Sequence, residues 1–172
     1  TGLVRIHGPA GRQVLHDFTF VNGAADRGAA IYAQSCSLRV EDCRFLANRA
    51  SVGGHVVYAE DTWLQFYGNR IINNGPGSGA IVELHGDTPG QDLVTTLRNN
   101  TFYRPYATAV VVAAGRVDID SNIFLDTAAP VLRDAATATV PFVRSNLFYD
   151  NQILLIDEKA DSIKLARTVR DT

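Results

Sequence analysis

Two aspartates separated by one residue, Asp118 and Asp120, are the acids whose spacing best suits hydrolytic chemistry. In an extended strand, side chains two positions apart project from the same face, about 7 Å from one another. This separation suits an inverting glycosidase, in which a water molecule must fit between the general acid and the general base. The pattern is unspecific, because any Asp-x-Asp in a strand satisfies it.

A lyase would use different groups around the same acids. It needs a base, commonly Lys or Arg, and often Ca²⁺ held by several carboxylates to neutralise the uronate. In the repeat register set by the apolar residues, Arg98 and Arg144 flank Asp120. Only three acids share this face, and no His/Cys group has the spacing of metal ligands. We therefore expect no resident metal or cofactor, and Ca²⁺ only if the protein is a lyase.

The element that positions these residues is a short strand that recurs about every 25 residues. One apolar position recurs at steps of 25, 26, 31, 22 and 24 residues, in Phe20, Phe45, Ile71, Phe102, Phe124 and Phe148. Five residues earlier stand Leu15, Val40, Phe66, Leu97, Ile119 and Val143. Apolar residues alternate within each run, as in a strand with one buried face. Helical repeats are excluded by this alternation and by the glycine content.

Stacked coils of short parallel strands account for this pattern, so the predicted fold class is all-β. We expect a single-stranded, right-handed parallel β-helix of about six to seven coils. Two residues before the Phe position the later repeats carry asparagine, at Asn69, Asn100, Asn122 and Asn146. Coil stacking would place these amides directly above one another, where they can hydrogen-bond as a ladder. We interpret them as structural.

A second apolar track is expected at 25-residue steps, through Ile6, Ile31, Val56 and Ile81. His55, beside the inward Val56, is then expected to face outward. The 31-residue step between Ile71 and Phe102 predicts a loop excursion, which we place at residues 85–92 because they are polar and rich in turn residues. Cys36 and Cys43 are too far apart along an extended chain for a disulfide and are expected to be free thiols, one of them buried.

Between the inward positions lie two outward columns of mixed polar and aromatic residues. Four residues before the Phe position stand His16, Glu41, Tyr67, Arg98, Asp120 and Arg144, and six before it Val14, Arg39, Gln65, Thr96, Asp118 and Phe142. This mixture is typical of a sugar-binding groove, with Glu41, Tyr67, Arg98, Asp120 and Arg144 as candidate binding residues. The alternative is a surface charge ladder, because the signs of Arg98, Asp120 and Arg144 alternate.

The Asn-x-Phe strand ends, at Asn100-Thr-Phe102, Asn122-Ile-Phe124 and Asn146-Leu-Phe148, resemble repeats of the pectate-lyase-like right-handed β-helix superfamily. The first half, with Gly28-Ala-Ala-Ile-Tyr32 and Gly53-Gly-His-Val56, is also similar to polymorphic outer-membrane-protein repeats of bacterial adhesins. The resemblance implies a secreted or cell-surface protein that often meets polysaccharide. It does not select an activity, because the superfamily includes lyases, hydrolases, adhesins and tailspikes.

The composition excludes several partners. A net charge of -2 and a pI near 6.0 give no basic field for nucleic acid, and no apolar run is long enough for a transmembrane segment. We expect one β-helix domain over residues 1–172, a fragment that packs against the rest of a longer chain. Residues 157–172 are predicted to form a degraded last coil or a cap.

Two functions from different classes fit these observations. The first is a non-catalytic β-helix module of a secreted or surface protein, acting as a scaffold or as an adhesin that contacts carbohydrate. The alternative is part of a polysaccharide lyase or glycoside hydrolase acting on an acidic polysaccharide, with Asp118, Asp120 and Arg98 as catalytic candidates. We favour the first, because no convergent cluster of acids and bases stands out from an ordinary β-helix surface.

Overall fold

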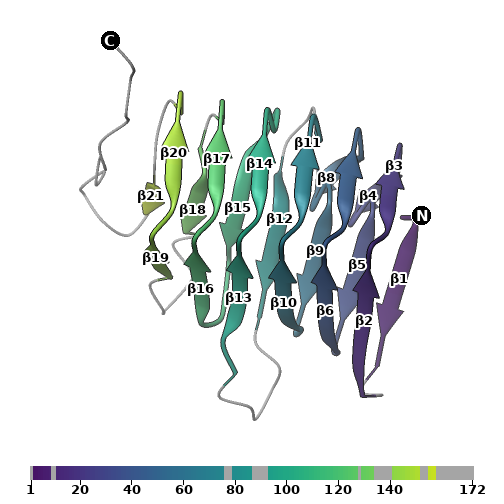
Figure 1. Ribbon diagram of the computed structural model, residues 1–172. Coiled ribbons are helices and arrows are strands. Elements are labelled where there is room, and N and C mark those ends of the chain that lie inside the picture. The colour runs from purple at the N-terminus through teal and green to yellow at the C-terminus, as the bar shows by residue number, and fades with distance from the viewer. Residues whose placement is uncertain are drawn as a thin grey trace.

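The computed structural model describes residues 2–8, 11–75, 79–86, 93–127, 129–133, 141–151 and 155–157. Throughout this part of the chain the regular elements are short strands, which wind into a right-handed parallel β-helix of about five turns (Figure 1). The number of turns is lower than the six to seven predicted. Six equivalent strands bound only five complete turns, and residues 158–172 of the predicted last coil lie outside the described residues.

Three parallel sheets run along the solenoid, and successive coils add successive strands to each (Figure 1). Sheet A contains β1 (Val4–His7), β5 (Ile31–Gln34), β9 (Val57–Glu60), β12 (Ala80–His85), β15 (Thr108–Val112), β18 (Val131–Arg133) and β21 (Leu155–Asp157). Sheet B contains β2 (Arg12–His16), β6 (Ser37–Glu41), β10 (Trp63–Tyr67), β13 (Thr95–Arg98), β16 (Val117–Asp120) and β19 (Phe142–Arg144).

Sheet C follows sheet B in each coil and contains β3 (Thr19–Val21), β7 (Arg44–Leu46), β11 (Arg70–Ile72), β14 (Thr101–Tyr103), β17 (Ile123–Leu125) and β20 (Leu147–Tyr149). The first two coils carry one more strand each, between sheets C and A. These strands, β4 (Ala24–Arg27) and β8 (Arg49–Gly53), pair as a two-stranded ribbon. The ribbon matters for function, because it lies beside the outer face of sheet A.

Both predicted inward columns are confirmed residue by residue. In sheet B, Leu15 pairs with Val40 and the column continues through Phe66, Leu97, Ile119 and Val143. In sheet C, the column from Phe20 to Phe148 is equally unbroken. The rings of Phe102 and Phe124 stack with centroids 4.9 Å apart. Large side chains of neighbouring coils therefore fill the core without gaps in register.

The predicted track on sheet A is wrong in its register. Ile31 pairs with Val4 and Val57, not with Ile6 and Val56, and Ile6 instead pairs with Ala33. The prediction assumed a constant step of 25 residues, whereas Val4, Ile31 and Val57 are separated by 27 and 26. The surplus is taken up before sheet A, where the β4–β8 pairing shifts register between Ala25 and Arg27.

The turn from sheet B to sheet C is made by one residue with left-handed backbone conformation. These residues are Asp17, Asp42, Gly68, Asn99, Ser121 and Ser145. Small polar residues and glycine tolerate this conformation best. The residue that follows each of them from the third coil on is an asparagine of the predicted ladder, whose side chain enters the corner between the two sheets.

The asparagine ladder is confirmed. The Oδ1 of Asn100 accepts hydrogen bonds from the main-chain N–H and Nδ2 of Asn69, at 2.9 and 3.0 Å. Its own Nδ2 donates to Asn122 and to the carbonyl of Phe66, at 2.9 and 2.8 Å. A second, shorter ladder joins Asn48 to Asn74 at the end of sheet C. Buried amides thus satisfy backbone groups that the sheets leave unpaired at the corners.

Three local expectations can be compared with the structure. Cys36 and Cys43 are free thiols, as predicted, but both are buried rather than one. The prediction for His55 is wrong: its side chain is buried, because a bend at Gly54 and His55 interrupts the strand alternation on which the prediction rested. The expected excursion at residues 85–92 begins after β12 ends at His85, and residues 87–92 lie outside the described residues.

Candidate functional site

The outer face of sheet B brings together the residues predicted to bind sugar. The strand register places His16, Glu41, Tyr67, Arg98, Asp120 and Arg144 in one column across six strands. The second predicted column, which includes Asp118, lies beside it in the same strands. The predicted juxtaposition is therefore present. Its role in binding or catalysis stays a prediction, and the contacts within it bear on which interpretation the geometry favours.

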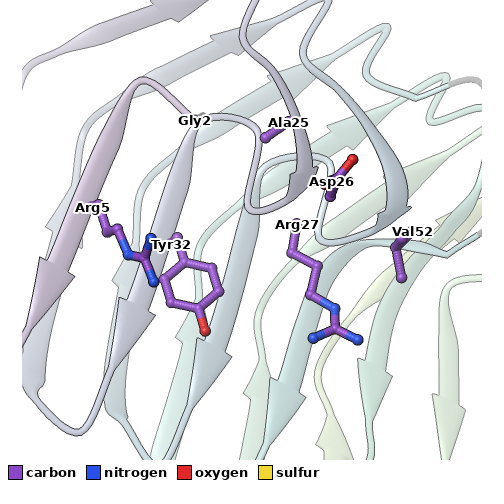
Figure 2. Close-up of a pocket in the computed structure, with 7 residues that line it drawn as sticks. All are labelled: Gly2, Arg5, Ala25, Asp26, Arg27, Tyr32 and Val52. Carbon is purple, nitrogen blue, oxygen red and sulfur yellow. The ribbon is translucent and has the colours of Figure 1, made fainter.

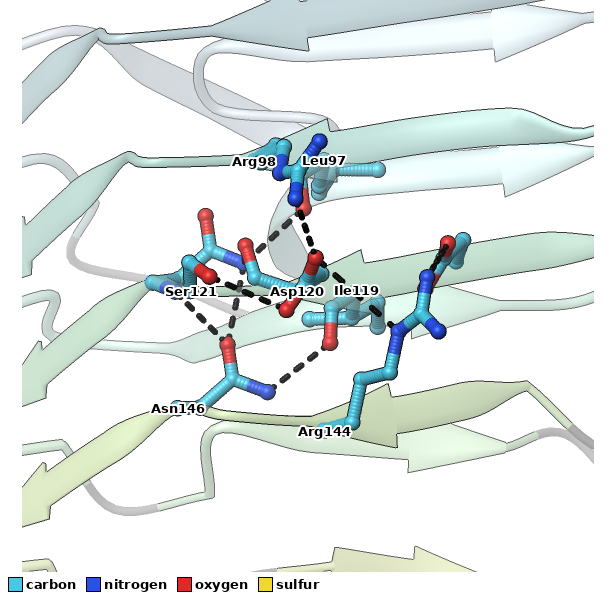
Figure 3. Close-up of polar contacts among 9 residues, drawn as sticks. Leu97, Arg98, Ile119, Asp120, Ser121, Arg144 and Asn146 are labelled. Atoms are coloured by element: carbon cyan, nitrogen blue, oxygen red, sulfur yellow. Dashed lines mark hydrogen bonds and ion pairs between the residues drawn. The ribbon is translucent and has the colours of Figure 1, made fainter.

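Charged residues in the last three of these strands form a paired network (Figure 3). Arg98 Nη2 lies 3.0 Å from Asp120 Oδ2, and Arg144 Nη2 lies 2.8 Å from Asp118 Oδ2. Ser121 Oγ donates to Asp120 Oδ1 at 3.0 Å, which occupies the second carboxylate oxygen. The network joins neighbouring coils along the solenoid and corresponds to the charge ladder rather than to a set of groups awaiting a ligand.

Tyr67 and Glu41 are engaged in the same way. The guanidinium of Arg39 lies over the Tyr67 ring, 5.5 Å from its centroid, and also pairs with the Glu41 carboxylate. A sugar that stacked on Tyr67 would first have to displace Arg39, at a cost of about 0.5–1 kcal/mol for an exposed cation–π contact. The ring does not present a free face to solvent.

The acid pair could act only after rearrangement. The side chain of Asp120 is only 7% exposed, and its partners Arg98 and Ser121 cover both oxygens. Asp118 retains one buried oxygen, Oδ1, without a hydrogen-bond partner. A catalytic acid and base on either side of a water molecule both need access to the substrate. Asp120 lacks that access in this structure.

A different face of the molecule carries a stack of aromatic and cationic side chains. On the outer side of sheet A, Arg5 lies over the ring of Tyr32, 4.8 Å from its centroid. Tyr32 stacks on Tyr58 of the next coil at 5.6 Å, and Tyr58 stacks on His85 at 4.6 Å. Arg27 of the β4–β8 ribbon lies over the same Tyr58 ring, 5.2 Å from its centroid.

A pocket of about 560 Å³ opens beside the first members of this stack (Figure 2). We call it the sheet A pocket, and its lining residues are Gly2, Arg5, Ala25, Asp26, Arg27, Tyr32 and Val52. Figure 2 shows Arg5 reaching toward the Tyr32 ring from β1, while Arg27 extends from β4 on the opposite side of that ring. The volume lies within the range of about 300–1,000 Å³ that is usual for small-molecule sites.

The sharp return of the chain from β4 to β5 creates this pocket. Gly28 has φ of +60°, and a side chain there would collide with the backbone of Ile31 and Tyr32. Only glycine allows the ribbon to turn this tightly onto sheet A. The register shift in β4 between Ala25 and Arg27 then changes the direction of the side chains next to the turn.

Two glutamates support the aromatic stack. Glu60 accepts hydrogen bonds from the Tyr32 hydroxyl at 3.0 Å and from Gln34 Nε2 at 3.3 Å. Burial raises the pKa of Tyr32, and the bond to Glu60 raises it further, so the phenol stays protonated. Burial alone would raise the pKa of Glu83, but hydrogen bonds from His85 and from the Ala80 N–H outweigh it, and the pKa is lowered.

Sequence reasoning missed the sheet A pocket, although one signal for it was present. Tyr32 and Tyr58 occupy the same place in the similar segments Ile31-Tyr-Ala33 and Val57-Tyr-Ala59. A tyrosine repeated at an outward position of two coils indicates a stack on the surface. Arg27 gave no such signal, because its contact with Tyr58 depends on the turn at Gly28 and on the ribbon.

The described residues contain no group of three or more His, Cys, Asp and Glu side chains that could hold a metal ion. Nor do they form a helix with the length and apolar character needed to cross a membrane. The fold defines the class of protein as a parallel β-helix. Comparison with family models, with curated proteins and with solved structures gave no match.

Proposed function

We propose that the chain is a non-catalytic β-helix module that binds carbohydrate in the sheet A pocket. The observation that carries the proposal is the pocket itself. It is open, of suitable volume, and combines an aromatic ring with charged hydrogen-bonding groups and the exposed apolar side chain of Val52. Sugars need both kinds of surface, because their C–H faces are apolar and their hydroxyls donate and accept hydrogen bonds.

The rigid scaffold supports the same proposal. Tyr32 is held by stacking on Tyr58 and by its hydrogen bond to Glu60, so little conformational freedom is left to lose on binding. A module of this kind belongs on a secreted or cell-surface protein that meets polysaccharide, as the pectate-lyase-like and adhesin resemblances imply. Scaffold and binding roles are compatible, because the pocket occupies only the first two coils.

The catalytic alternative has less support. A polysaccharide lyase or glycoside hydrolase would need Asp118 and Asp120 accessible to substrate, but arginines pair with both carboxylates. An assay for new unsaturated uronate ends or reducing ends tests it directly. Activity that falls about a hundredfold or more in Asp120→Asn would establish the enzyme and overturn the non-catalytic assignment.

A glycan array followed by calorimetry with the polymers that bind tests the proposed site. Tyr32→Ala should weaken binding about tenfold or more, because it removes the aromatic wall and the ring on which Arg5 rests. Tyr106→Ala is the matched control, since Tyr106 is exposed and lies outside the sheet A pocket. Equal affinity of wild type and Tyr32→Ala would show that carbohydrate binds elsewhere.

A further inference from the structure

Arg5 and Arg27 differ from the other arginines discussed so far. Arg39, Arg98, Arg104 and Arg144 each pair with a carboxylate. Among the described residues, Arg5 and Arg27 have no such partner, and both contact tyrosine rings instead. Two guanidinium groups without a counter-charge therefore line one pocket.

We propose that the sheet A pocket selects an acidic sugar, whose carboxylate or sulfate is bound by Arg5 and Arg27. This inference rests on the proposed carbohydrate site and adds the class of ligand. A guanidinium offers a planar fork of N–H donors that matches both anions, and such charge-assisted bonds are about twice as strong as neutral ones.

The contacts to tyrosine favour this role. A guanidinium stacked on a ring uses its face, so its N–H groups at the edge remain available to an anion. Arg5 is held in this way by Tyr32 and Arg27 by Tyr58, and these rings stack on one another. Two donor forks are thus held by adjacent coils before any ligand arrives, which lowers the entropic cost of binding.

Asp26 gives the pocket a complementary acceptor. Its Oδ1 accepts a hydrogen bond from Ser51 Oγ at 2.8 Å, and the carboxylate has further acceptor capacity for sugar hydroxyls. With two arginines and one aspartate, the charged lining residues sum to one positive charge. The whole chain has a net charge of -2, so attraction of a polyanion must come from this local site and not from the protein as a whole.

Calorimetry on the 172-residue chain with matched polymer pairs tests the inference. Oligogalacturonate is compared with its methyl ester, which keeps the sugar but removes the charge, and dextran sulfate with dextran. We expect at least about tenfold tighter binding to an acidic member than to its neutral counterpart, weakening as salt is added. The tighter of the two acidic polymers identifies whether carboxylate or sulfate is preferred.

Three variants locate the interaction. Arg5→Gln and Arg27→Gln should each lose about tenfold in affinity for the acidic polymer, because each removes one charged fork. Arg104→Gln is the control: Arg104 is also exposed, but it pairs with Asp126 outside the sheet A pocket, and its loss should not change affinity.

The outcomes separate this inference from the proposed function. Binding that ignores charge and survives both glutamine substitutions, but is lost in Tyr32→Ala, would overturn the acidic-sugar assignment and leave the carbohydrate site intact. An equal loss in Arg104→Gln would show non-specific electrostatics and also overturn it. If no polymer of the array or of these pairs binds, the proposed function fails together with the inference.

Discussion

His55 is a buried histidine whose two ring nitrogens have different environments. Nδ1 accepts a hydrogen bond from the Ala50 N–H at 2.8 Å, whereas Nε2 has no partner among the described residues. Burial lowers the pKa of His55, and the Arg49 charge lowers it further, against an opposing effect of Glu83. Protonation would turn Nδ1 into a donor that faces another donor, so folding favours the neutral ring.

The stability of the protein should therefore depend on pH through His55. Because the folded pKa lies below the ordinary value of 6.5, the contribution of this residue is complete above pH 6.5 and is lost as the pH falls through the folded pKa. Denaturant unfolding between pH 7.5 and pH 5 measures it. The lowered pKa of Glu83 adds a similar loss, but below its ordinary value of 4.5, outside this range.

His55→Asn provides the comparison, because an asparagine Oδ1 can accept the Ala50 hydrogen bond but does not titrate. The variant should lose less stability than wild type between pH 7.5 and pH 5. Parallel curves for the two proteins would show that another group causes the acid sensitivity.

Asp120 is the residue at which the ladder and the active-site interpretations diverge most. Asparagine keeps its shape and can still accept from Ser121, but loses the ion pair with the half-exposed Arg98. For a ladder residue, Asp120→Asn should lower the free energy of unfolding by about 1 kcal/mol or less and leave carbohydrate binding unchanged. Chemical denaturation and calorimetry check both parts, and a large loss of binding would return this face to consideration as a site.

At the scale of the element, the asparagine ladder is a main determinant of the corner between sheets B and C. Asn100→Ala removes four hydrogen bonds and leaves the Asn69 N–H and the Phe66 carbonyl without their partner. Since each unsatisfied buried group costs about 1–3 kcal/mol, we expect a loss of about 3 kcal/mol or more in unfolding free energy. The part-buried Asn146 offers the control, because Asn146→Ala should cost clearly less.

A strand of sheet C has two faces with very different energetic weights. Phe124 is fully buried between Phe102 and Phe148, whereas its neighbour Leu125 points outward in the row that includes Tyr103 and Tyr149. Phe124→Ala should cost about 3–5 kcal/mol, because it leaves a cavity in the stack. Leu125→Ala should cost less than about 1 kcal/mol. Similar values for the two variants in urea unfolding would contradict the register.

At the scale of the whole molecule, the solenoid separates stability from binding. Each coil contacts chiefly its neighbours, so the effect of a substitution decays along the stack. The sheet A pocket belongs to the first two coils, and Phe124 lies several coils away (Figure 1). Phe124→Ala should therefore destabilise the protein while leaving affinity for the carbohydrate unchanged under native conditions. Calorimetry beside urea unfolding tests this, and a weakened affinity in the folded variant would indicate coupling between coils.

The sequence alone determined the fold class, both inward columns and the asparagine ladder. In a parallel β-helix each of these is a repeated local pattern: Phe102 and Phe124, or Asn100 and Asn122, occupy equivalent places in successive coils. Repetition multiplies a signal that a single strand would leave ambiguous. The same regularity also placed Asp120 between Arg98 and Arg144 correctly, although it could not tell whether those charges would pair with one another or with a ligand.

Tertiary structure alone decided what the irregular segments do. The sheet A pocket exists because the ribbon turns at Gly28 and brings Arg27 over Tyr58, which stands 31 residues further along the chain. His55 is buried because a bend interrupts the strand alternation on which its exposure was predicted. Periodicity carries information only where the backbone repeats, and turns and bulges change which way a side chain points without changing the composition that a sequence displays.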